Sequence, residues 1–114
     1  MALTPRQEAQ VSSLLSAYCH ARVPARIRDQ VRLGFRIDGQ AVELLESRPS
    51  FDDSRVWREQ AVAKFRYVAA KRVWRLYCQY RDLKWHEYKP RHTARSFAQL
   101  LDEVDRDPTG IFWG

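Results

Sequence analysis

Apolar residues at helical spacing mark a helix near the start of the chain. Four of them recur at i, i+3, i+4 and i+7, namely Val11, Leu14, Leu15 and Tyr18. Thr4 precedes this stripe as a candidate N-cap, with Gln7 three residues later. Pro5 then occupies the first helical position, where its missing N–H costs nothing. Pro24 should end the helix near Arg22.

A second stripe with the same spacing lies near the end of the chain. Its members are Phe97, Leu100, Leu101 and Val104. Ser96 and Gln99 form a capping-box pattern in front of it, with Thr93 as an alternative start, and the helix should end before Asp107-Pro108. The apolar tail at residues 111–114 should dock on the fold, because burying each aromatic ring is worth roughly 1.5–3 kcal/mol.

Between the helices the period of the pattern changes to two. After a short helical turn predicted for Ala25–Gln30, apolar and polar residues alternate from Val31 to Asp38, which is typical of a half-buried strand. Asp38-Gly39 predicts a two-residue type I′ turn. The resulting hairpin would pair Ile37 with Gln40, Phe35 with Val42, and Leu33 with Leu44.

Residues 48–60, RPSFDDSRVWREQ, interrupt the alternation with Pro49 and with Asp52-Asp53-Ser54. This composition predicts a long connection. Its two large aromatic residues, Phe51 and Trp57, would anchor the connection on the rest of the fold.

Alternation returns in Ala63–Tyr88, which holds two of the four tryptophans and four of the five tyrosines. This stretch predicts three further strands with a bend around residues 69–72. A tight hairpin over Asp82-Leu83 would pair Tyr80 with Trp85 and Gln79 with His86.

These elements predict the α+β class: an N-terminal helix, a five-stranded antiparallel sheet connected mostly by hairpins, a C-terminal helix and an apolar tail. One or both helices would pack on the apolar face of the sheet. That face would contain Val31, Leu33, Phe35, Val42, Leu44, Phe65, Tyr67, Trp74, Leu76, Tyr80 and Trp85.

Composition adds constraints on domain number and location. A chain of 114 residues with 45% apolar residues is typical of one domain with one core, here spanning residues 1–114. The sequence contains no run of eighteen apolar residues and no secretory signal pattern, so we expect a cytoplasmic protein without a membrane partner. In that compartment Cys19 and Cys78 would be ordinary buried thiols.

The net charge of +6 matters through its arrangement. In the predicted registers, basic and aromatic residues share the second face of the sheet, with Glu43 as its only acid. The candidate binding residues are Arg32, Arg36, Lys64, Arg66, Arg75, Tyr77, Arg81, Lys84, His86 and Tyr88. Such a face suits single-stranded nucleic acid, because cations neutralise phosphates and rings stack on bases, and it also suits an acidic protein. The simpler interpretation is an ordinary polar face in contact with solvent.

An enzymatic alternative rests on Asp82-Leu83-Lys84 together with Glu43 or Glu46 upstream. Metal-dependent nucleases hold Mg²⁺ with two carboxylates and support the attacking water with a lysine. The match is poor because Asp82 would sit in a tight turn. We therefore predict no catalytic residues. The histidines and cysteines lack the paired spacing of a zinc site, and no cofactor motif is present, so no metal or cofactor is expected either.

The acidic segment 102–107 is the main negative patch of the sequence. It could be the solvated side of the last helix. It could also meet the basic sheet face of another copy, which would make the chain a homodimeric protein–protein interaction module.

The chain resembles a bacterial family of small proteins defined only as a domain of unknown function, number 3024. The resemblance rests on AKFRY at residues 63–67, VWRLY at 73–77, RDLKWHEY at 81–88 and FWG at 112–114. It covers nearly the whole chain and implies a stand-alone bacterial domain, with no activity, substrate or catalytic residues to carry over. Cys78 stands where a second tryptophan is expected, and this substitution leaves the position apolar.

Overall fold

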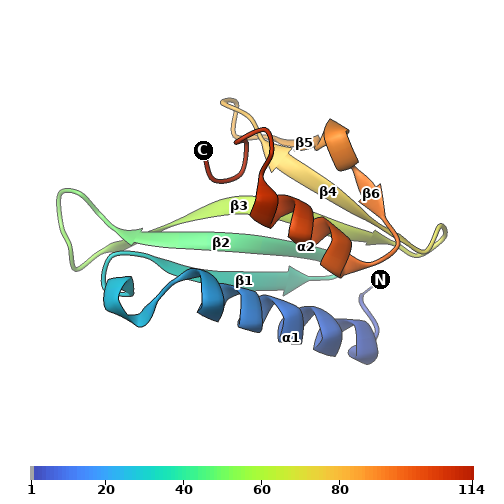
Figure 1. The fold of residues 1–114 in the computed structure, drawn as a ribbon, viewed down its shortest axis with the longest axis horizontal. Coiled ribbons are helices and arrows are strands. Elements are labelled where there is room, and N and C mark those ends of the chain that lie inside the picture. Colours follow the sequence, from blue (N-terminus) through green and yellow to red (C-terminus); the bar gives the residue numbers. More distant parts are fainter. Residues whose placement is uncertain (1) are drawn as a thin grey trace.

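The computed structural model describes residues 2–114 as two helices packed on an antiparallel sheet, which confirms the α+β class (Figure 1). The elements are α1 (Pro5–Arg22), the 3-10 helix η1 (Ala25–Ile27), β1 (Arg32–Asp38), β2 (Ala41–Pro49), β3 (Trp57–Val68), β4 (Val73–Gln79), β5 (Trp85–Glu87), the 3-10 helix η2 (Lys89–Arg91), β6 (Thr93–Ala94) and α2 (Phe97–Arg106).

The sheet has the order β1-β2-β3-β4-β5, and every neighbouring pair is antiparallel. The predicted count of five strands is short by one, because β6 pairs with β4 at Trp74 and Arg75. A strand of two residues is too short to show alternation in the sequence. It lies along the same edge of β4 as β5, because β5 pairs with residues 77–79 of β4 and β6 with residues 74–75.

Both helices lie on the same face of the sheet, which we call the core face (Figure 1). Helix α1 packs alongside β1, and α2 lies over β3 and β4. The buried strand residues of the core face are Val42, Leu44, Ala63, Phe65, Trp74, Leu76 and Cys78. We call the opposite face, which neither helix covers, the outer face.

Local hydrogen bonds set the start of each helix as predicted. The Thr4 hydroxyl accepts from the Gln7 backbone N–H at 3.1 Å, and the Gln7 side chain accepts from the Thr4 N–H at 2.9 Å. Ser96 and Gln99 make the same reciprocal pair at 3.3 Å in front of α2. Both capping boxes satisfy N–H groups that the first turn of a helix leaves without partners.

The predicted register of the β1–β2 hairpin is wrong by two residues. Phe35 pairs with Leu44 instead of Val42, because the two-residue loop is Gly39-Gln40. Gly39 has φ of 61°, and a type II′ turn requires positive φ only at this first central position. An even shift leaves every side chain on its predicted face.

The predicted register of the β4–β5 hairpin is wrong by one residue, and this error exchanges the faces of β5. Gln79 pairs with Trp85 and Cys78 with His86, so Trp85 lies on the outer face. The loop between the strands runs from Tyr80 to Lys84 and is longer than the predicted turn. Leu83, with φ of 61°, donates its N–H to the Tyr80 carbonyl at 2.9 Å and closes the loop.

The shifted register of β5 also directs Tyr88, the residue after this strand, to the core side of the sheet. Tyr88 is buried there, with only 2% of its surface exposed. Its hydroxyl donates to Glu103 Oε2 at 2.8 Å, and its ring centroid lies 5.0 Å from that of Phe112. The prediction that Tyr88 belongs to the basic face is wrong. The prediction that Trp85 belongs to the core face is wrong for the same reason. Tyr80 is not part of the buried core either, because it lies in the loop and is exposed, with its ring stacked on His86.

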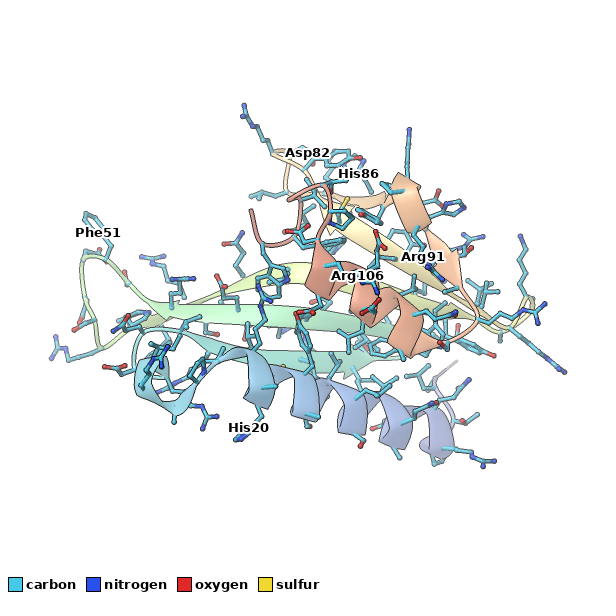
Figure 2. All side chains as sticks on the ribbon, in the orientation of Figure 1. His20, Phe51, Asp82, His86, Arg91 and Arg106 are labelled. Atoms are coloured by element: carbon cyan, nitrogen blue, oxygen red, sulfur yellow. The ribbon has the colours of Figure 1, made fainter. Side chains whose placement is uncertain are left out.

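The predicted connection over residues 48–60 is also wrong, because both strands continue into it. β2 reaches Pro49 and β3 begins at Trp57, so the pair forms a long hairpin that extends past α1 (Figure 1). A bulge at Val62 separates this extension from the core, since Leu44 pairs with Ala63 and Leu45 with Ala61. Phe51, a predicted anchor, is fully exposed at the tip (Figure 2).

The apolar tail docks as predicted. The Asp107 carboxylate accepts the backbone N–H groups of Phe112 at 3.0 Å and Trp113 at 2.8 Å. Phe112 is buried, and the Arg22 guanidinium lies 4.0 Å from the Trp113 ring centroid. These contacts hold the tail on the core-face side of the molecule.

Neither helix within residues 2–114 combines the length and apolar character needed to cross a bilayer.

We predict that Trp74→Ala strongly destabilises the fold. Trp74 is 5% exposed and packs against Phe97 and Tyr67, with ring centroids 5.1 and 5.2 Å away. Removing a buried ring should lower the free energy of unfolding by about 3–5 kcal/mol. Urea unfolding followed by circular dichroism measures it. The matched control is Trp85→Ala, which removes a half-buried ring from the outer face and should cost only about 1 kcal/mol. Equal losses in the two variants would contradict the assignment of faces.

We also predict a loss of stability at alkaline pH. Burial raises the pKa of Tyr18 to about 12, and burial together with the Glu103 hydrogen bond raises the pKa of Tyr88 to about 12. Unfolded tyrosine ionises near pH 10. The stabilisation is therefore complete below about pH 10 and is lost as pH rises toward 12.

Urea unfolding at pH 9 and pH 11, with tyrosinate absorbance recorded in parallel, tests this prediction. Tyr18→Phe and Tyr88→Phe should each reduce the fall in stability between the two pH values. Ionisation of both side chains near pH 10 in the wild-type protein would contradict it.

Candidate nucleic-acid interface

The outer face carries the charged and aromatic side chains that the strands direct away from the helices. Cross-strand pairing defines its rows, of which one joins Arg36, Glu43, Lys64, Tyr77 and Glu87. The members with charged or aromatic side chains are Arg32, Arg36, Asp38, Glu43, Trp57, Glu59, Lys64, Arg66, Arg75, Tyr77, Trp85 and Glu87.

The structure places six of the ten sequence-predicted binding residues on this face. These are Arg32, Arg36, Lys64, Arg66, Arg75 and Tyr77. The other four lie elsewhere. Tyr88 is in the core, His86 points to the other side of β5, and Arg81 and Lys84 lie in the exposed loop between β4 and β5.

His86 organises that loop instead of lining the basic face. Its ring stacks on Tyr80 with centroids 4.1 Å apart, and its Nε2 lies 2.9 Å from Asp82 Oδ2 (Figure 2). Asp82 Oδ1 accepts the Lys84 backbone N–H at 2.9 Å. This N–H and His86 together lower the pKa of the Asp82 carboxyl below its usual value. Asp82 and His86 therefore stabilise the turn.

Two tryptophans that sequence reasoning left out belong to the outer face. Trp85 replaces Tyr88 there, and the Lys64 ammonium lies 5.9 Å from its ring centroid. Trp57 lies beneath Arg32, whose guanidinium is 3.8 Å from the ring centroid. Asp82 signals a turn in this loop but does not signal its length, so the sequence offered no cue for placing Trp85.

The outer face is less basic than predicted, because Asp38, Glu59 and Glu87 join Glu43 on it. Arg36 forms two ion pairs, with its Nη2 2.7 Å from Glu43 and its Nη1 3.5 Å from Glu59.

Positive charge on this face therefore depends on the remaining cations. Arg75 approaches Glu87 only at 4.0 Å. Within residues 2–114, Arg32, Lys64 and Arg66 have no carboxylate within 4 Å. The unneutralised charge is concentrated on β3 and β4, next to Tyr77 and Trp85.

The acidic residues considered for a nuclease have other partners. Glu43 pairs with Arg36 and Glu46 with Arg48, while Asp82 is bound to His86 and the loop backbone. In the part of the chain that the structure describes, no three histidine, cysteine or acidic side chains are grouped so that they could hold a metal ion.

The acidic segment of α2 also binds groups of its own chain. Asp102 pairs with Arg106 at 3.0 Å, and Asp105 pairs with Arg22 at 3.2 Å and accepts from the Tyr18 hydroxyl at 3.1 Å. Glu103 and Asp107 accept from Tyr88 and from the tail, as described above. Asp105, Glu103 and Asp107 thus connect α2 to α1, to Tyr88 and to the tail, whereas Asp102 pairs within α2 itself.

A comparison with protein-family models gives one match, the family described as Domain of unknown function (DUF3024), which covers residues 3–114. No curated protein and no solved structure matches the chain. Since the family match spans all but the first two residues, the chain belongs to the DUF3024 family.

Proposed function

We propose that this chain is a non-catalytic, cytoplasmic binding domain that holds single-stranded nucleic acid on its outer face. The observation that carries the proposal is the cluster formed by Tyr77, Trp85 and Lys64. Two half-buried rings lie on adjacent strands, and the Lys64 ammonium from β3 lies 5.9 Å from the Trp85 ring centroid.

The two rings offer a stacking surface for bases. Lys64 pairs with Tyr77 across β3 and β4, and Trp85 lies diagonally from Tyr77 across β4 and β5. Diagonal neighbours in a sheet are close enough for large rings to form one continuous surface. Base–aromatic stacking contributes about 1–3 kcal/mol per base and tolerates any base, because every base has a π-face.

The cations around these rings would bind the phosphate backbone. Lys64 and Arg66 point from β3 to the same face as the rings and have no carboxylate partner within residues 2–114. Each phosphate contact releases a condensed counterion, so affinity should fall as salt concentration rises.

The shape of the face favours single strands over duplex. Both helices within residues 2–114 lie on the core face, so the outer face presents no helix for a major groove. A sheet with rings flush on its surface can accept bases only after they are unstacked. An acidic protein would use the same cations but would gain less from the rings.

We predict binding of a fluorescently labelled single-stranded DNA or RNA at low salt, measured by anisotropy at two salt concentrations. Trp85→Ala should weaken binding by about tenfold through lost stacking. Arg66→Glu and Lys64→Glu should each weaken it by a similar factor and reduce its salt dependence.

The matched control is Arg6→Glu, which makes the same change of charge on α1, the helix on the opposite side of the sheet from the outer face. It should retain wild-type affinity. A duplex of the same sequence should bind more weakly than the single strand. Absence of single-strand binding at low salt, or equal losses in Arg6→Glu and Arg66→Glu, would reject the proposal. Stronger binding to a polyglutamate peptide than to nucleic acid would reject it in favour of an acidic protein partner.

A further inference from the structure

Two arginines face each other directly on the outer face. Arg66 of β3 pairs with Arg75 of β4, in a row that continues to Ala41 on one side and Thr93 on the other. Side chains at such positions have Cβ atoms about 4.5–5.5 Å apart, and like charges placed there repel each other. A third charge of opposite sign between the two guanidinium groups would turn this repulsion into attraction.

No carboxylate of residues 2–114 lies between them. Arg66 forms no ion pair there, and the only acidic partner of Arg75 is Glu87, at 4.0 Å from Nη1. Arg75 Nε is buried and has no hydrogen-bond partner among the described residues. A buried guanidinium N–H without an acceptor costs free energy that a bound anion can recover.

A cavity of about 370 Å³ opens at this pair. Arg66, Arg75 and Tyr77 line it together with Gln40 and the end of the β3–β4 hairpin. Three donor-bearing side chains of these strands therefore border one space large enough for a phosphate group. The turn beside it adds Lys71 and Arg72, which have no ion-pair partner within residues 2–114.

We propose that Arg66 and Arg75 form a binding site for a phosphate monoester, and that this site holds the terminal phosphate of the single strand. The second half of this inference rests on the proposed function. Charge matching favours the monoester: it carries about −1.5 to −2 at neutral pH, close to the sum of two guanidinium charges. An internal phosphodiester carries one negative charge and would leave half of that charge unmatched.

Oligonucleotides of one sequence with a phosphate at the 5′ end, at the 3′ end or at neither end test the site. One phosphorylated form should bind about tenfold more tightly than the unphosphorylated form, as expected for a charge-assisted bidentate contact. Arg66→Gln and Arg75→Gln should abolish this difference. Arg6→Gln, the matched control on α1, should retain it.

Thermal unfolding in inorganic phosphate and in sodium chloride of equal ionic strength gives a second readout. Phosphate should raise the Tm of the wild type but not of Arg66→Gln. In chloride, Arg66→Gln should have a higher Tm than the wild type, because it removes the repulsion with Arg75. A side chain that only supports the fold would give the opposite change.

Equal affinity for all three oligonucleotides, together with no effect of phosphate on Tm, would overturn the proposal. Equal affinity with a phosphate effect on Tm that Arg66→Gln abolishes would overturn the terminal-phosphate assignment and keep the monoester site. If no oligonucleotide binds while this phosphate effect persists, the proposed function fails and the site serves a small phosphorylated molecule.

Discussion

The two-layer structure depends on one aromatic contact between α2 and the sheet. Phe97, in the first turn of α2, packs on Phe65 of β3 and Trp74 of β4, with ring centroids 4.6 and 5.1 Å away. Ser96 caps α2 directly before Phe97, so the helix begins where this contact is made. Side chains alternate along a strand, and burial of Phe65 and Trp74 therefore directs Arg66 and its neighbours to the outer face.

Short-range sequence patterns predicted the residues of this core, but they did not predict the registers of two hairpins. The capping boxes and the alternation along β3 and β4 were sufficient to identify the helices and the buried residues. At Gly39 an error of two residues left the faces intact. At Leu83 an error of one residue exchanged Trp85 with Tyr88 between the faces. In that loop Leu83 adopts positive φ, and leucine has no preference for this conformation from which the longer loop could have been predicted.

Segments outside the core could not be predicted from periodicity. In the β2–β3 extension Arg58, Glu59 and Gln60 are exposed, so its sequence lacks the apolar alternation of a half-buried strand, and Phe51 at its tip contacts no core. Glu59 reaches the outer face through this extension, and Glu87 through the shifted register of β5. The predicted excess of positive charge was therefore too large, although the face itself was correctly assigned for six of its ten proposed residues.

The two halves of the outer face differ in how their charges are paired, since opposite charges face each other on β1 and β2 and like charges on β3 and β4. This difference argues against a face that serves only solubility. On β1 and β2, Arg36 stands opposite Glu43 and binds it at 2.7 Å. On β3 and β4, Arg66 stands opposite Arg75, and like charges directly opposite each other destabilise a sheet. A glutamate at either position would keep the face polar and would stabilise the sheet by pairing with the remaining arginine. Solvation therefore accounts for the β1–β2 half, whereas on the β3–β4 half an anion from outside the chain would relieve the repulsion between Arg66 and Arg75.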